Sequence, residues 1–511
     1  MPTAAPIEVE LKLAVAARDL PRLRRRLERL GPARRVRLET IYYDTHDGLL
    51  AAHGFALRLR RVGERWIQTL KSETEAAALA RRGEWEWPLR RPRLDRACLA
   101  DTPLAPLLAR RPRVSFAELF RTRFARDTWI VEEDGACIEL ALDQGEIRAG
   151  ERSEAIRELE LELESGAAEA LPALALRIAR AGGGRPLALL PYGDSKARRG
   201  QRLAAGAAPQ PVKAQAQRLL RDLRADDAAE AALKRAVGRA TEVLLANAHG
   251  ALAYDDPEFV HQARVALRRM RSALRLLRRQ VEFPARLAAD LRWIARALGA
   301  ARDCDVLVGQ MLPAIAASFD PGLGPACERL LAQAQRRRGR ARDEARAALA
   351  SPRFAGATLA LLAWSAARPR GGGPTLQTLA AKLLQRQHAR LFEAAHAFAE
   401  LSAEKQHRVR ILAKRLRYAL DFFAIALPER ATAAYAKRLA ALQDELGAIN
   451  DAAVARAHLR TLVRARALRE ALDAWAARTR RDRAIAVERR LARLRERPVP
   501  WRRGAGSGGG R

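Results

Sequence analysis

The spacing of hydrophobic and polar positions changes once along the chain. Up to about residue 203, short segments alternate apolar and polar residues with a period of two, as in strands that bury one face. After residues 204–215, long runs rich in Ala, Leu and Arg have helical spacing. The pattern predicts an α+β protein with a strand-rich domain at 1–203, a linker at 204–215, an all-α domain at 214–495 and a disordered Gly-rich tail at 496–511.

Two of the predicted strands each carry an acidic face. Residues 7–13 place Glu8, Glu10 and Lys12 opposite an apolar face, and residues 156–163 place Glu158 and Glu160 in the same way. Such faces are common on solvated sheets, but neighbouring like charges repel each other and gain no packing. A bound cation such as Mg²⁺ or Mn²⁺ would remove that cost.

Other strand-like segments in this half carry basic residues between the two acidic strands. Arg58 and Arg60 lie in ALRLR, Lys71 ends WIQTLK, and Arg82 precedes GEWEW. Carboxylates that hold a metal, together with cations that bind a multiply charged anion, would satisfy both sets of charges. The pattern therefore favours a site for a metal and a polyphosphate group.

The residues over about 5–203 resemble the CYTH superfamily, the triphosphate tunnel metalloenzymes. Glu8 to Lys12 matches its ExExK signature, and further segments follow in the order of that family: YYDT (42–45), ALRLR (56–60), TLK (69–71), RGEWEW (82–87), RDTWIV (126–131), IELALDQGEI (138–147), ELELELESG (158–166) and SKARRG (195–200). The resemblance implies an eight-stranded antiparallel barrel with a charged interior.

The same resemblance implies roles for individual residues. The implied metal ligands are Glu8, Glu10, Glu139, Asp143, Glu158 and Glu160. The implied phosphate contacts are Lys12, Arg58, Arg60, Lys71, Arg82, Arg126 and Lys196. The implied catalytic set is Glu8, Glu10, Lys12, Lys71, Glu158 and Glu160.

The implied reaction is in-line attack of water on a terminal phosphoryl group, assisted by Mg²⁺ or Mn²⁺. Inorganic triphosphate is the expected substrate, because the likeness is strongest to bacterial inorganic triphosphatases that carry a C-terminal CHAD domain. Thiamine triphosphatases and class IV adenylate cyclases share the same lining, so thiamine triphosphate or a nucleotide stays an alternative. A polyphosphate-binding protein without catalysis is the other alternative.

The helical half contains an internal duplication. HQARVALRRMRSAL (261–274) and HRVRILAKRLRYAL (407–420) superpose at a spacing of 146 residues, and each is followed by a Leu-Gly and an Asp. Helical spacing puts the basic residues of each copy on one face, separate from an apolar face. These residues are His261, Arg264, Arg268 and Arg271 in the first copy and His407, Arg410, Lys414 and Arg417 in the second.

Two such rows across a pseudo-twofold axis would form a basic channel for a linear polyanion. One row alone is typical of a solvated face. No recognisable DNA-binding motif occurs and aromatic residues are scarce near the rows, so specific nucleic-acid binding is not expected. For His261 and His407, a structural hydrogen bond to Asp303 or Asp451 is the alternative to phosphate contact.

Residues 214–495 resemble the CHAD domain, which is named for its histidines on α-helices. The resemblance implies two four-helix bundles around a basic pore that binds inorganic polyphosphate. The eight residues of the two rows are the implied polyphosphate contacts. This domain would concentrate the protein on polyphosphate granules or supply chain ends to the barrel.

Charge supports a polyanionic partner. Lys and Arg number 94 against 59 Asp and Glu, a formal net charge of +35, of which residues 1–205 carry +7 and the remainder +28. Scattered cysteines, no apolar run long enough to cross a membrane and no apolar leader predict a cytoplasmic protein without a membrane partner. Oligomeric state is not encoded in these patterns.

Overall fold

The computed structural model describes residues 7–502 apart from 73–76, 182–183, 318, 320 and 464–465. The side chains of residues 7, 81, 82 and 321 are also outside the description, so the expected phosphate contact of Arg82 lies outside it. The chain divides into two compact units. The first comprises Met1–Lys213, Thr241–Gln262 and Ala348–Ala367, and the second Ala214–Ala240, Ala263–Ala347 and Arg368–Arg511.

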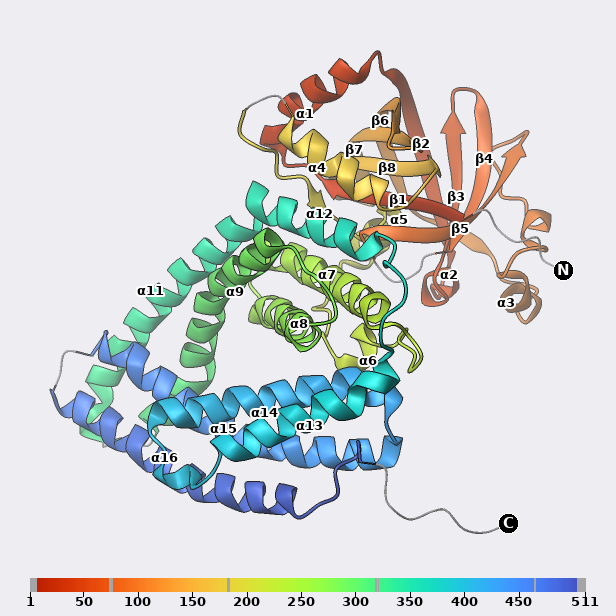
Figure 1. Cartoon of the computed structure of the whole chain (residues 1–511). Coiled ribbons are helices and arrows are strands. Elements are labelled where there is room, and N and C mark those ends of the chain that lie inside the picture. The colour runs from red at the N-terminus through yellow and green to blue at the C-terminus, as the bar shows by residue number, and fades with distance from the viewer. Residues whose placement is uncertain are drawn as a thin grey trace, which may run out of the picture. The chain divides into compact units, whose positions relative to one another are not determined.

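The first unit is built on an antiparallel sheet that closes on itself (Figure 1). Its strands are β1 (Ile7–Ala14), β2 (Arg34–Thr45), β3 (Phe55–Val62), β4 (Arg65–Ser72), β5 (Leu79–Leu89), β6 (Phe116–Glu133), β7 (Ala136–Ala149), β8 (Arg152–Ser165) and β9 (Leu190–Pro191). The order is β5-β4-β3-β2-β6-β7-β8-β1-β9, and β1 also pairs with β5. The pairing of β1 with β5 closes the eight strands β1 through β8 into one ring, which confirms the predicted barrel. The two-residue strand β9 is an addition that pairs with β1 outside this ring.

Strand register brings the interior charges opposite one another. Lys12 on β1 faces Glu160 on β8, Glu158 faces Asp143 on β7, and Asp143 faces Arg126 on β6. Because side chains alternate along a strand, every second residue of each strand points into the barrel. Four strands, β1, β6, β7 and β8, thereby bring together acids and bases that lie far apart in sequence.

The other face of these strands is apolar and covered. Leu11, Leu13, Leu159 and Leu161 are each 0% exposed. Helix α4 (Ala170–Arg180) packs on β1 and β8 and is itself contacted by α1 (Leu20–Leu27). Burial of both strand faces fixes the register, since a shift by one residue would place Leu in the interior and Glu against a helix.

Helix α5 (Lys196–Ala205) packs against β6, β7 and β8. Ser195 caps its start by accepting a hydrogen bond from the backbone N–H of Arg198 at 3.1 Å, as N-cap serines commonly do. Gly200 allows the close approach to the barrel, because a Cβ there would lie 2.1 Å from the ring of Phe120. The cap and this contact hold Lys196, the first helical residue, at the barrel interior.

The helical region contains two successive sets of four long helices, in agreement with the predicted all-α C-terminal region. They are α7 (Ala229–Ala253), α8 (Pro257–Leu276), α9 (Ala285–Val306) and α11 (Gly324–Leu349), then α13 (Leu376–Ala394), α14 (Ala403–Phe423), α15 (Glu429–Arg460) and α16 (Arg466–Arg495). Shorter helices in this region are α6 (Ala216–Leu219), α10 (Leu312–Ala316) and α12 (Pro352–Ala366). Two further short helices, α2 (Leu49–Ala52) and α3 (Ala105–Ala109), lie between strands of the barrel.

The second set packs in chain order, α13 on α14, α14 on α15 and α15 on α16. Helix α15 contributes Leu439, Leu442, Leu446 and Ile449 to the core, at most 8% exposed, with the spacing of one helical face. In the described part of the chain no single helix has the length and apolarity to span a membrane, although the bent pair α11 and α12 passes that test together.

The C-terminal end is packed further than the sequence suggested. Trp501 is 6% exposed, its ring centroid lies 5.3 Å from that of Tyr435, and its indole N–H donates to Gln385 at 3.1 Å. The predicted disorder of residues 496–511 is therefore wrong as far as Trp501, because the indole ring packs against Tyr435 and is buried. Residues 503–511 lie outside the described residues.

Candidate functional site

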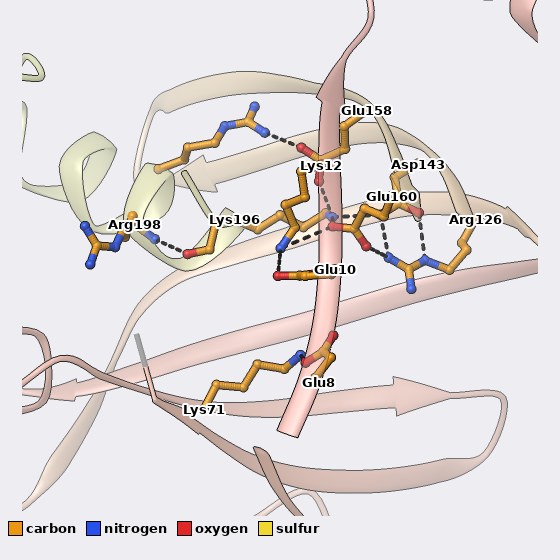
Figure 2. A network of polar contacts seen from close by, with 12 residues as sticks. Glu8, Glu10, Lys12, Lys71, Arg126, Asp143, Glu158, Glu160, Lys196 and Arg198 are labelled. Carbon is orange, nitrogen blue, oxygen red and sulfur yellow. Dashed lines mark hydrogen bonds and ion pairs between the residues drawn. The ribbon is translucent and has the colours of Figure 1, made fainter. Parts of the chain in front are cut away.

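The barrel encloses a cavity of about 210 Å³ whose lining is dominated by charged side chains. Figure 2 shows how several of them converge from β1, β6, β7, β8 and α5. The charged lining residues are Glu8, Glu10, Lys12, Arg58, Arg60, Lys71, Glu84, Glu86, Arg126, Glu160, Glu162 and Lys196.

One end of this network is an acidic triad formed by Asp143, Glu158 and Glu160. One carboxylate oxygen from each residue lies within 4.8 Å of the others. The ammonium group of Lys196 pairs with all three, at 2.7 Å from Asp143 Oδ2 and 2.9 Å from Glu160 Oε1 (Figure 2). The amine thus stands where a small cation would neutralise the three carboxylates.

Asp143 and Glu158 are buried and Glu160 is half-buried, and the neighbours of Glu160 favour its ionised form. Burial opposes ionisation of Glu160, but Lys196, Lys12 and Arg126 hold its pKa well below the ordinary value. Burial likewise opposes the charge of Lys196, and Asp143 and Glu158 outweigh it and raise the lysine pKa. At neutral pH the site is a compact set of opposite charges.

Arg126 closes the triad from β6. Its guanidinium donates to both oxygens of Asp143, at 2.8 Å through Nε and 2.7 Å through Nη2, and also contacts Glu160. This two-point geometry fixes the plane of the arginine, as is typical of Arg–carboxylate pairs.

The opposite wall is built around β1. Lys71 Nζ lies 2.8 Å from both Glu8 Oε2 and Glu84 Oε2, and Lys12 Nζ lies 2.7 Å from Glu10 Oε1. Burial and the neighbouring carboxylates Glu8 and Glu10 raise the pKa of Glu162 to about 8. This wall therefore contains more carboxylates than its lysines neutralise, and a cation would relieve that imbalance.

Two arginines from β3 face the same space. Arg58 pairs with Glu84 at 3.0 Å and is 6% exposed. Burial, with the nearby charges of Arg58 and Arg126, lowers the pKa of Arg60 to about 10. An anion in the cavity would restore the ordinary pKa of Arg60 and would be bound more tightly in return.

The donor set fits a divalent cation. Asp143, Glu158 and Glu160 offer only carboxylate oxygens, the ligands that Mg²⁺ and Mn²⁺ prefer, and Glu8 and Glu10 add further oxygens across the cavity. The identity of the metal is not set by this geometry. The surrounding lysines and arginines suit phosphate oxygens.

The structure brings most of the expected site residues together. Those that line the cavity are Glu8, Glu10, Lys12, Arg58, Arg60, Lys71, Arg126, Glu160 and Lys196, while Asp143 and Glu158 join them through the triad. Glu139 is neither in that lining nor in the triad, and burial raises its pKa. Its assignment as a metal ligand gains no support from the geometry.

Four residues of the network were not assigned a role from the sequence. Glu162 continues the two-residue spacing of Glu158 and Glu160, so a signal was present. Arg199, which donates to Glu158 at 2.9 Å, lies one helical turn after Lys196. Tyr42 and Glu84 line the cavity through strand pairings that sequence spacing does not reveal.

In the second unit, the two duplicated helices supply one basic cluster, consisting of Arg264 and Arg268 from α8 and Arg410 and Lys414 from α14. Burial and the charges of Arg410 and Arg268 lower the pKa of Lys414 to about 7. Arg264 also lowers it, which places all four cations within electrostatic reach of one another. The equivalent positions of the two repeats therefore meet.

Each repeat brings one aspartate to this cluster. Asp303 lies 3.8 Å from Arg264. Burial lowers the pKa of Arg410, and the charge of Asp451 offsets part of that effect. The sequence had suggested these aspartates as partners of the histidines. For His407 that suggestion is wrong, since Nδ1 of its ring lies 2.9 Å from Oδ1 of Asn450, one residue before Asp451.

The remaining row residues diverge from the cluster. Arg417 donates to Gln443 at 2.9 Å, and Arg271 is surrounded by Arg275, Arg292 and Arg296, whose charges, after burial, lower its pKa. His261 lies half-buried on α8. The helical twist carries the ends of each row onto neighbouring surfaces.

Comparison with known proteins identifies the two parts. The model of the CYTH domain matches residues 6–181 and that of the CHAD domain matches residues 235–460. The chain therefore contains a CYTH domain, whose curled antiparallel sheet holds the charged cavity, followed by a CHAD domain that contains the basic cluster.

Particular relatives resemble one part or the other. An inorganic triphosphatase of Haemophilus influenzae is 33% identical over 165 residues, 31% of this chain and 46% of that protein, so the chain spans about half of its length. The CHAD domain of Ricinus communis is 34% identical over 57% of this chain and 99% of that one, with a TM-score of 0.47. A Hippeastrum protein described as an adenylyl cyclase with dominant triphosphatase activity is 19% identical over 40% of this chain and 97% of that one, with a TM-score of 0.30.

Proposed function

We propose that the CYTH domain hydrolyses inorganic triphosphate with the help of Mg²⁺ or Mn²⁺. The observation that carries this proposal is the acidic triad of Asp143, Glu158 and Glu160 inside a cavity lined with lysines and arginines. The CYTH match and the similarity to an inorganic triphosphatase support the class of reaction. Attack by a water molecule beside the metal needs no Ser, Cys or His nucleophile.

Substrate binding exchanges ion partners within the cavity. Lys12, Lys71 and Arg58 now pair with carboxylates, and the oxygens of a triphosphate would take over those contacts. Lys196 would leave the triad when a cation enters it and turn its ammonium group to the phosphate. A divalent cation held by the triad would neutralise charge on the phosphoryl group under attack. The charged cavity walls would hold the triphosphate so that water attacks the terminal phosphorus opposite the leaving oxygen.

A substrate panel tests this proposal. Phosphate release from inorganic triphosphate, ATP and thiamine triphosphate is measured with Mg²⁺ or Mn²⁺, and we expect inorganic triphosphate to have the highest kcat/KM. Glu160→Gln removes one triad carboxylate and should lower kcat by at least about 100-fold, the scale seen when a preorganised charge is lost. Glu8→Gln should also lower activity.

The control is Glu151→Gln, which removes the same charge from an exposed turn between β7 and β8. Equal activity of wild type, Glu160→Gln and Glu8→Gln would overturn the catalytic reading. Faster turnover of ATP or thiamine triphosphate would assign another substrate to the same site. Absence of hydrolysis with every substrate would leave polyphosphate binding as the function.

We propose further that the CHAD domain binds inorganic polyphosphate through the cluster of Arg264, Arg268, Arg410 and Lys414. Burial, with the charges of neighbouring arginines, lowers the pKa values of Arg264, Arg410 and Lys414, and a flexible chain of phosphates would supply negative charge to all four cations. This would also place the protein on polyphosphate granules in the cytoplasm.

The test compares two double variants that remove equal charge. Arg264→Ala with Arg410→Ala should weaken polyphosphate binding at least roughly tenfold, since a charge-assisted contact contributes about 1.5–3 kcal/mol. Arg478→Ala with Arg489→Ala, both exposed on α16, should change the affinity little. Equal affinities of the two double variants would show that general basicity alone attracts the polymer.

A further inference from the structure

A second concentration of arginine lies outside this cluster, on the surface of the same unit. We define the outer arginine patch as Arg275 near the end of α8, Arg278 and Arg279 in the turn that follows it, Arg386 and Arg390 on α13, and Arg415 on α14. Four of them, Arg275, Arg278, Arg279 and Arg390, are exposed. The patch therefore presents positive charge to solvent.

Helix packing gathers these residues from three helices. Helix α13 packs on α14, and α8 is fastened to α14 where Arg269 pairs with Asp421 at 2.7 Å and lies with its guanidinium carbon 5.2 Å from the ring centre of Tyr418. Arg386 and Arg390 are one helical turn apart, as are Arg271 and Arg275. Residues of these three helices and of the turn after α8 thus lie within electrostatic reach of one another.

Like charges within the patch lie close enough to act on one another. Arg390, Arg279 and Arg278 lower the pKa of Arg386. Burial and then Arg275, Arg390 and Arg278 lower that of Arg415, whose Nε is buried without a hydrogen-bond partner among the described residues. Such a surface gains free energy from an anion that spans several arginines.

The patch is continuous with the basic cluster along α8. Arg264, Arg268, Arg271 and Arg275 follow one another on α8 at intervals of three or four residues, a path of about 16.5 Å at 1.5 Å per residue, and Arg278 lies in the turn just beyond the helix. Arg271 couples electrostatically to Arg264 at one end and to Arg275 at the other. One polymer could therefore contact both regions.

We infer that the outer arginine patch is an extension of the polyphosphate site that holds the part of a long chain beyond the basic cluster. This inference rests on the proposed function of the CHAD domain. It assigns chain-length selectivity to the protein: short polyphosphate would contact only the cluster, and long polyphosphate would contact the cluster and the patch together.

The surroundings of the patch favour a polymer without bases. The exposed large apolar residues of the described chain are Leu30, Ile130, Tyr254, Leu331, Ile425 and Ile485, and none of them belongs to the patch. Single-stranded nucleic acid normally binds with aromatic stacking platforms, which this surface does not supply from that set. Arginine guanidinium groups can bind a row of phosphates through charge-assisted hydrogen bonds without any base stacking.

The experiment measures binding of a short and a long inorganic polyphosphate to the full-length protein at several salt concentrations. Arg278→Ala with Arg390→Ala removes two exposed patch residues, and Arg478→Ala with Arg489→Ala is the matched control. We expect the patch variant to lose at least about fivefold in affinity for the long chain, with a salt dependence shallower by roughly one to two counterions. Its affinity for the short chain should equal that of wild type.

Arg278→Lys with Arg390→Lys keeps the charge and should retain most of the long-chain affinity. Equal long-chain affinity of the patch and control variants would overturn the inference, as would an equal loss for short and long chains. Displacement of the long chain by single-stranded DNA of the same charge, sensitive to the same variants, would assign the patch to nucleic acid instead. If Arg264→Ala with Arg410→Ala binds both chains normally while the patch variant loses the long chain, polyphosphate binds at the patch without the cluster, which contradicts both the cluster proposal and the inference that the patch extends it.

Discussion

The barrel interior and the helical cluster are both rich in Lys and Arg, yet they neutralise these charges in different ways. In the barrel, Lys196 and Arg126 each pair with carboxylates of the triad at distances under 3 Å. In the helical unit, Lys414 faces Arg410, Arg268 and Arg264, and burial with these charges lowers its pKa to about 7. The barrel cations have close internal counterions that ligands must displace, whereas among the described residues the four cations of the cluster have only Asp303 and Asp451 nearby, which leaves a surplus of positive charge for a ligand.

The largest expected effect tests the internal counterion of the barrel. Lys196→Met leaves Asp143, Glu158 and Glu160 buried without their shared cation, and should lower the free energy of unfolding by about 3–5 kcal/mol in the absence of divalent metal. Mg²⁺ or Mn²⁺ should raise the melting temperature of this variant more than that of wild type, because a cation replaces the amine. Thermal and denaturant unfolding with and without metal measure both effects.

Lys213→Met, which removes an exposed lysine, is the control. If metal stabilises wild type, Lys196→Met and Lys213→Met equally, the amine does not stand in the place of a cation.

The second prediction, with an intermediate effect, concerns how the affinity of the basic cluster for polyphosphate depends on pH. Because the pKa of Lys414 is lowered to about 7, this lysine is largely neutral above that pH in the free protein and charged below it. A bound polyanion favours the charged form, so binding takes up a proton and affinity should rise up to about tenfold as pH falls from about 9 to about 6. Lys414→Arg should flatten this dependence. An affinity that is as pH-dependent in Lys414→Arg as in wild type would assign the proton to another group.

The third prediction, with the smallest effect, compares how salt changes amide hydrogen exchange in the basic cluster and in the barrel. Chloride screens repulsion between partly exposed arginines, whereas the buried ion pairs of the barrel are screened much less. Raising the salt concentration should therefore slow amide hydrogen exchange in α8 and α14 by roughly two- to fivefold, and leave β7 and β8 nearly unchanged. An equal response of β7 and β8 would show that the barrel charges are not internally neutralised.

The sequence predicted the strand faces and the duplicated helices because each follows one period over many residues. Glu8, Glu10, Glu158 and Glu160 could be placed inside a barrel from their two-residue spacing and the family likeness. The pairing of Lys71 with Glu84, or of Arg58 with Glu84, depends on cross-strand register between β3, β4 and β5, which periodicity leaves undetermined.

The same limit applies to the histidines. The spacing of the repeat placed Arg264 and Arg410 at equivalent positions of two helices, but a shift of one residue on α15 decided whether His407 contacts Asn450 or Asp451. Helical side-chain direction changes by about 100° per residue, so motif spacing alone does not choose between adjacent partners. The burial of Trp501 was missed because its partners lie on α13 and α15, more than 60 residues away.

The closure of the barrel by its first strand has a consequence for the order of folding. Strand β1 pairs with β5 and β8, and β8 ends at Ser165, so the ring cannot close until that strand has left the ribosome. During synthesis the apolar face of β1 therefore stays uncovered until β8 has been made. Closing a loop of about 150 residues between β1 and β8 is also slow compared with local helix formation. The strand that carries Glu8, Glu10 and Lys12 is the first of the barrel strands to be made and the last to be fully paired, so the charged cavity and the native barrel should form in the same late step.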